Sequence, residues 1–140
     1  MNDKERATQR KRIRTLRDRW HAYLGLQPWE ITYVYTDGDF ESNVLATTKV
    51  EGQYLRAGID WNLRSAEQQS DAELEFAVVH ELMHVMVNDL RRFRSDGKTE
   101  AILDEVERFN EERVCTALAR AFINTRDKSQ TRRVIMGDPS

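Results

Sequence analysis

Apolar residues that recur every three or four positions mark an amphipathic helix near the amino terminus. The stripe consists of Ile13, Leu16, Trp20 and Leu24. This spacing predicts a helix over about residues 4–24. Gly25 is suited to end the helix because glycine adopts left-handed backbone angles without strain, and Pro28 prevents the helix from resuming.

Three segments with strand character follow the first helix. Large and polar side chains alternate over residues 29–35 on a β-branched and aromatic background, which is typical of a half-buried strand. Residues 44–50 and 54–61 have a similar character, and Glu51-Gly52-Gln53 between them favours a hairpin. We therefore expect a small antiparallel sheet of three strands.

Two long helices are predicted in the second half of the chain. Ser70 with Glu73 three positions later forms a capping box, which begins a helix that extends to about residue 90. Residues 91–98 are charged and contain a glycine, so we expect a loop there. A second helix is predicted over 99–123, and the polar segment 124–140 is expected to be a flexible tail.

The order of these elements predicts an α+β fold in which the helices lie on one side of the antiparallel sheet. With 140 residues the chain has room for one core. We divide it into a basic amino-terminal helix (1–28), a single domain (29–123) and the polar tail (124–140).

Charge is distributed unevenly, although the whole chain has a formal net charge of only −2. Residues 1–19 contain eight basic and three acidic side chains, a local net charge of +5, so the remainder carries −7. Such a basic segment is suited to contact nucleic acid or an acidic partner. The competing interpretation is an ordinary solvated helix face, which the lack of interleaved aromatic residues favours.

The apolar runs and the cysteine content exclude further classes of protein. The longest apolar runs are far shorter than the roughly 20 residues that cross a bilayer, and the charged start Met1-Asn2-Asp3-Lys4-Glu5-Arg6 does not resemble a signal peptide. We therefore expect a cytoplasmic protein without a membrane partner. Because Cys115 is the single cysteine, an internal disulfide and a multi-cysteine zinc site are excluded.

Residues 80–84 form the pentapeptide His80-Glu81-Leu82-Met83-His84, an HExxH motif. On a helix the two histidines lie about 40° apart and one turn along the same face, so both imidazoles can bind one Zn²⁺ ion. Glu81 follows the first ligand and is placed to act as the general base. The helix around the motif is apolar on all sides, and a buried glutamate beside two histidines needs a compensating charge such as a divalent cation.

A catalytic zinc site usually has a third protein ligand. The next helix offers five acidic residues, Asp104, Glu105, Glu107, Glu111 and Glu112. Glu111 lies on the same stripe as Val114, Leu118 and Phe122, whereas Glu112 lies at its edge, where small residues at 115 and 119 let the helices approach. Helix geometry leaves both glutamates open as the third ligand.

The HExxH motif followed by a glutamate on the next helix resembles the gluzincin arrangement. Together, Ala77-Val78-Val79-His80-Glu81-Leu82-Met83-His84-Val85 and the segment Glu111-Glu112-Arg113-Val114-Cys115 resemble small metallopeptidase-like proteins of bacteriophages and mobile elements, which are distantly similar to the ImmA/IrrE group. The resemblance covers about residues 29–123. It implies His80, His84 and Glu112 as zinc ligands, with Glu111 as the alternative, and Glu81 as the catalytic residue. It also implies host-cell cytoplasm or a virion as the location.

These features predict a zinc metallopeptidase whose substrate is a protein or peptide. We expect the strand over residues 54–61 to present an edge for an extended substrate, and we name Tyr54, Arg113 and Tyr35 as candidates to stabilise the oxyanion. The alternative function is a non-catalytic structural or interaction protein that zinc stabilises and that contacts nucleic acid through the basic helix.

Overall fold

The computed structural model describes residues 1–38, 43–88 and 100–136, except for the side chains of 100–107 and 127–136. Along the chain the elements are α1 (Asp3–Tyr23), β1 (Glu30–Thr36), β2 (Ala46–Glu51), the 3₁₀ helix η1 (Gly52–Tyr54), β3 (Arg56–Asn62), α2 (Leu63–Glu67), α3 (Asp71–Val87) and α4 (Glu100–Met136). The loop predicted over residues 91–98 lies outside the described residues. The α+β class is confirmed.

The three strands form a mixed sheet with the order β1-β3-β2. β2 and β3 pair antiparallel, as the hairpin prediction required, but β1 pairs parallel with β3. The expected all-antiparallel sheet is therefore wrong. Ala57, Ile59 and Trp61 of β3 are almost completely buried, and the apolar character of this strand explains why it takes the central position.

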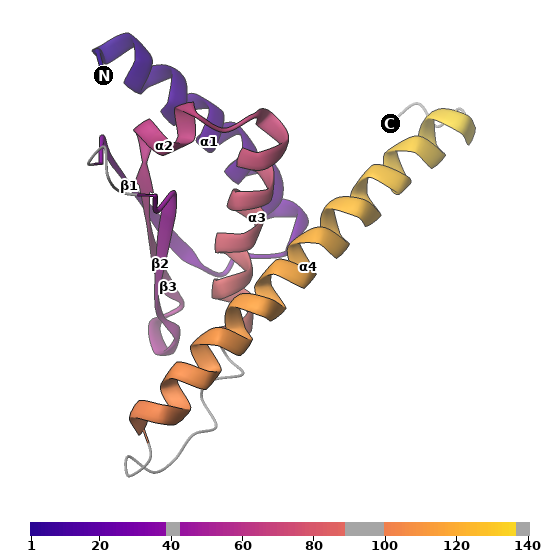
Figure 1. Cartoon of the computed structure of the whole chain (residues 1–140). Coiled ribbons are helices and arrows are strands. Elements are labelled where there is room, and N and C mark those ends of the chain that lie inside the picture. Colours follow the sequence, from indigo (N-terminus) through magenta and orange to yellow (C-terminus); the bar gives the residue numbers. More distant parts are fainter. Residues whose placement is uncertain (39–42, 89–99, 137–140) are drawn as a thin grey trace.

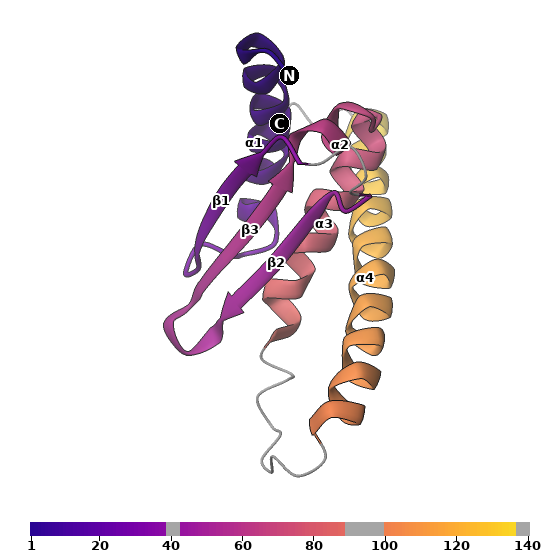
Figure 2. The same cartoon turned by 60° about the vertical axis from the view of Figure 1, so that its left-hand side comes forward.

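All four α-helices lie on one face of the sheet, as predicted (Figures 1 and 2). α3 packs between the sheet and α4, and α1 contacts α3 beside it. Side chains alternate between partly buried and exposed along β1 and β2, so the charged residues of both strands lie on the outer face, whereas Thr48 lies on the inner face. Among the described helices, none has the length and apolar character needed to cross a membrane.

The capping signals in the sequence mark helix ends correctly. Ser70 caps α3 and forms the capping box with Glu73, which lowers the pKa of the Glu73 carboxyl because the Ser70 main-chain N–H donates to it. Gly25 follows α1 with a φ of +71°. α3 ends at Val87 within the described part of the chain, slightly before the predicted end near residue 90.

Two helical features differ from the prediction. The short helix α2 was not predicted; Asn62 caps it by accepting from the main-chain N–H groups of Arg64 and Ser65. α4 continues through Met136, so residues 124–136 are helical rather than an irregular tail. The polar composition of residues 124–136 led to the prediction of a tail. These residues contain neither glycine nor proline, and a helix that packing has already started can continue through them without an apolar stripe. Residues 137–140 lie outside the described residues.

The basic helix α1 uses several arginines to contact the rest of the chain. The contacts link Arg6 to Asp37, Arg12 to Asp71, Arg19 to Glu75, Arg10 to the Tyr35 ring and Arg17 to the Tyr33 ring. The Arg6 guanidinium holds the pKa of the Asp37 carboxyl below its usual range by donating hydrogen bonds to both of its oxygens. Much of the local positive charge is therefore engaged within the protein.

Glu75 on α3 joins three helices at the far end from the histidines. The indole N–H of the fully buried Trp20 donates to Glu75 Oε1 at 2.7 Å, and Arg126 of α4 donates to the same oxygen at 3.1 Å. The Arg126 guanidinium also lies over the Trp20 ring, 4.9 Å from its centroid. This cluster fixes the second half of α4 against α1 and α3.

Replacement of Glu75 should therefore destabilise the fold more than replacement of a surface acid. Glu75→Ala leaves the buried Trp20 N–H without its acceptor, which is expected to lower the free energy of unfolding by about 1–3 kcal/mol. Asp71→Ala is the matched control because it removes an exposed ion pair with Arg12 and should have a much smaller effect. Urea denaturation measures the free energy of unfolding of both variants. Equal losses of stability in the two would contradict a stabilising role of the cluster.

Candidate metal centre

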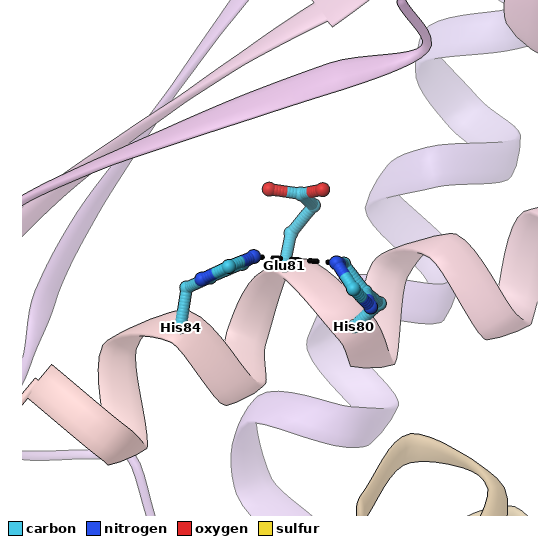
Figure 3. Close-up of side chains that lie close together, drawn as sticks. All are labelled: His80, Glu81 and His84. Atoms are coloured by element: carbon cyan, nitrogen blue, oxygen red, sulfur yellow. Dashed lines mark hydrogen bonds between the residues drawn. The ribbon is translucent and has the colours of Figure 1, made fainter. Parts of the chain in front are cut away.

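The two histidines of the HExxH motif lie on the face of α3 that is turned toward α4. Their rings stand one helical turn apart, with the Nε2 atoms 3.2 Å from each other (Figure 3). The Glu81 side chain leaves the helix between them and points away from the helix axis (Figure 3). Both histidine side chains are largely buried, with exposed fractions of 15% for His80 and 13% for His84.

The Glu112 carboxylate of α4 faces both Nε2 atoms. Its Oε2 lies 3.0 Å from His80 Nε2, and its Oε1 lies 3.1 Å from His84 Nε2. Three donor groups therefore converge with mutual separations of 3.0–3.2 Å. Ligands at ordinary Zn–N and Zn–O distances of about 2.1 Å in a tetrahedron are about 3.4 Å apart. The two Nε2 atoms and the Glu112 carboxylate, which contacts each ring through a different oxygen, are therefore close enough together to bind one cation.

The second nitrogen of each histidine ring has its own partner on α4. Glu111 Oε1 lies 2.8 Å from His84 Nδ1, and Thr116 Oγ1 lies 3.4 Å from His80 Nδ1. An acceptor at Nδ1 favours the tautomer that leaves Nε2 with its lone pair, which is how metal-binding histidines are usually held. Glu111 and Glu112 thus occupy different places: Glu111 orients a histidine, and Glu112 faces the point between the two rings.

Glu81 is turned toward the sheet. It is only 9% exposed, and Thr48 of β2 donates a short hydrogen bond from its hydroxyl to Glu81 Oε2. The Thr48 hydroxyl also lies 3.5 Å from the Glu81 main-chain oxygen. The carboxylate that sequence analysis assigned to the general base is therefore held by an edge strand that is distant in sequence.

A cavity of about 480 Å³ connects these groups. It is lined by Ala46, Thr47, Thr48, His80, Glu81, His84, Arg108, Glu111 and Glu112. Arg108 is the only arginine or lysine among the described residues that line the cavity. Since three carboxylates also line it, a divalent cation together with Arg108 would balance their charge, so the donor set and the charge both fit Zn²⁺.

The three residues predicted to stabilise the oxyanion lie outside the cavity that contains the histidines. Tyr54 is 62% exposed in η1, and Tyr35 lies on the inner face of β1 with its ring beneath Arg10. Arg113 lines a neighbouring hollow of about 630 Å³, which shares Glu112 with the cavity. None of the three is among the residues that line the cavity with the histidines.

Cys115 lies behind the site. It is fully buried on α4, and its sulfur is close to the ligand atoms of His84 and Glu111. Burial, together with the nearby carboxylates of Glu111 and Glu112, raises the pKa of the thiol to about 12. Because thiolates rather than thiols are nucleophiles and metal ligands, this environment suits the packing role predicted for Cys115.

Small residues bring α4 close to α3. Cys115 and Ala119 are completely buried, one and two turns after Glu111, and short side chains allow helices to approach closely. The core stripe is centred on these residues rather than on Val114, which is 43% exposed. This packing turns Glu111 and Glu112 toward the histidines.

The sheet edge beside the site belongs to β2, not to the strand expected from the sequence. Residues 54–61 cover the last residue of η1 and most of β3, and β3 has a neighbour on both sides. It therefore offers no free edge to a substrate. β2 pairs with β3 alone among the described strands, and its first three residues line the cavity.

Three residues of the site were not predicted: Thr48, Arg108 and Thr116. Arg108 and Thr116 lie four positions before and after Glu112, so helical spacing alone could have drawn attention to them. Thr48 had no comparable signal, because its contact with Glu81 depends on strand order and on the packing of β2 over α3.

Searches of protein-family models, curated proteins and solved structures with this chain found no match. The resemblance to small phage metallopeptidase-like proteins therefore stays a prediction.

Substitution of the two glutamates should separate a ligand from an orienting residue. Glu112→Gln replaces the carboxylate that faces both Nε2 atoms, so we expect zinc affinity to fall by more than about 100-fold. Glu111→Gln is the matched variant and should cost about 10- to 100-fold, as is typical of groups that orient a ligand. Competition with a chromogenic chelator measures both affinities, with His80→Ala as the variant that lacks a ligand. A larger loss in Glu111→Gln would identify Glu111 as the third ligand.

Proposed function

We propose that this protein is a zinc-dependent peptidase that hydrolyses peptide bonds. The observation that carries the proposal is the convergence of His80, His84 and Glu112 on one point, with the Glu81 carboxylate beside it in the same cavity. Three protein ligands with one open position are typical of catalytic rather than structural zinc. The two histidines and Glu112 would hold the ion.

A zinc ion held by these residues would polarise the scissile carbonyl and would lower the pKa of a water molecule to near neutrality. Glu81 then acts as the general base: it takes a proton from the attacking water and passes it to the leaving amine. Its burial and its place next to His80 support this role. Glu111 keeps the His84 ring oriented through Nδ1.

The edge of β2 that pairs with no other described strand is suited to bind an extended peptide. The Asn62 main-chain N–H donates to the Leu45 oxygen, so this pair is hydrogen-bonded, and alternate pairs along an antiparallel ladder are not. Ala46, Thr48 and Val50 therefore turn their main-chain N–H and C=O groups away from β3. Addition of a substrate strand at this edge would place its peptide bonds along the cavity.

Arg108 is placed to stabilise the oxyanion that forms during attack. It lines the cavity on the α4 side, one helical turn before Glu112. A positive charge near the developing negative charge lowers the barrier. Arg108 takes the role that sequence analysis assigned to Tyr54, Arg113 or Tyr35.

Glu81→Gln tests the catalytic role directly. The variant keeps its size and should bind zinc with wild-type stoichiometry, but without a base its kcat should fall by about 100- to 10,000-fold. Zinc content is measured by elemental analysis, and hydrolysis is measured on a library of quenched fluorescent peptides with and without a chelator. Unchanged, chelator-sensitive turnover in Glu81→Gln would contradict the assignment of the base. A wild-type protein that binds zinc but cleaves no peptide would favour the non-catalytic alternative.

Arg108→Ala should lower kcat by about 100-fold with little change in KM, because an oxyanion contact is made mainly in the transition state. Arg113→Ala is the control, since Arg113 also lies on α4 but lines the neighbouring hollow. Steady-state kinetics on the preferred peptide compare the two variants. Equal effects of the two substitutions would rule out a specific role for Arg108.

A further inference from the structure

Thr48 links the candidate base to the sheet edge. Its side chain lies on the inner face of β2, and its hydroxyl donates to Glu81 Oε2. Its main-chain N–H and C=O point the other way, toward the open edge, because Thr48 and Ile59 form a pair that is not hydrogen-bonded. A single residue thus contacts the carboxylate on one side and borders the proposed substrate groove on the other.

The hydrogen bond restricts a side chain that otherwise has considerable freedom. A glutamate has three rotatable torsions, and a carboxylate needs one oxygen directed at the water from which it takes a proton. Thr48 occupies Oε2 of Glu81, which leaves Oε1 for that water. Threonine itself is stiff at χ1 because it is β-branched, so its hydroxyl is well placed to hold the carboxylate in one orientation.

The neighbouring residues of β2 cannot replace this contact. Ala46 and Val50 share the inner face with Thr48 but carry no hydroxyl, and Thr47 lies on the exposed outer face. The interaction with Glu81 therefore depends on position 48 and on the register of β2 against β3.

We infer that Thr48 is a positioning residue for Glu81: it holds the carboxylate in the orientation needed for proton transfer and ties that orientation to the strand that receives the substrate. The inference rests on the proposed peptidase function. It adds to that function a residue that the HExxH motif does not contain and that touches neither the proposed metal ligands nor the α4 carboxylates in the described contacts.

Thr48→Val tests this role because it removes the hydroxyl while keeping shape and β-branching. We expect kcat to fall by about 10- to 100-fold, as for other groups that orient a catalytic residue, with KM changed by less than about twofold. Zinc affinity should not change. Thr48→Ser should restore most of the rate, and Thr32→Val, on the outer face of β1 and outside the lining of the cavity, should behave like the wild type. Unchanged kcat in Thr48→Val, or no rescue by serine, would overturn the inference.

A stability cycle on the zinc-free protein gives a readout that does not require hydrolysis. Melting temperatures of Thr48→Val, Glu81→Leu and the double variant should be non-additive, because the second substitution finds the hydrogen bond already removed. Additive shifts in melting temperature would show that Thr48 and Glu81 do not interact, and this result would overturn the inference. A zinc-loaded wild type that cleaves no peptide would instead overturn the proposed function, and with it the role of Thr48 in catalysis. Should Thr48→Val fail to fold, Thr48→Ala enters both experiments in its place.

Discussion

The packing of α4 against α3 is the contact on which the candidate site depends. α3 alone supplies two histidines and Glu81, which are one short segment of chain. The buried residues Cys115 and Ala119 let α4 approach, and this approach brings Glu112 to both Nε2 atoms and Glu111 to His84 Nδ1. At the other end of α4, Arg126 joins Glu75 and the buried Trp20. The position of the carboxylates is thus fixed by the close packing at Cys115 and Ala119 and, further along α4, by the contact of Arg126 with Glu75.

The same arrangement also lowers the stability of the fold when no cation is bound. Three carboxylates line one cavity, and in the absence of a cation their mutual repulsion opposes the packing of α4 on α3. A cation bound by His80, His84 and Glu112 would relieve that repulsion, so metal binding and folding are expected to be linked. The Trp20, Glu75 and Arg126 cluster lies outside the cavity and contributes to the same helix packing without a metal. The packing of α4 at the histidines is therefore expected to depend on the metal, whereas its packing at the Trp20, Glu75 and Arg126 cluster is not.

Features with a local signal could be predicted from the sequence. The capping box at Ser70, the glycine after α1 and the spacing of His80 and His84 depend on neighbours within one or two turns. Features that depend on contacts between distant parts of the chain could not be predicted. A parallel or an antiparallel β1 buries the same alternating face, so periodicity could not predict the mixed sheet. Glu111 and Glu112 could not be separated by helix angles alone, because the direction of each carboxylate depends on how α4 crosses α3.

Strand order also constrains what the cavity can receive. Since β3 is central, β2 is the strand whose main chain borders the cavity, and its inner side chain at position 48 reaches Glu81. Recognition through main-chain hydrogen bonds requires a partner in an extended conformation, and it reads side chains only at alternate positions. A substrate bound in this way must present an unfolded segment or a loop that can straighten, because a helix cannot pair with β2. Selectivity among substrates would then depend on which segments are accessible as much as on their sequence.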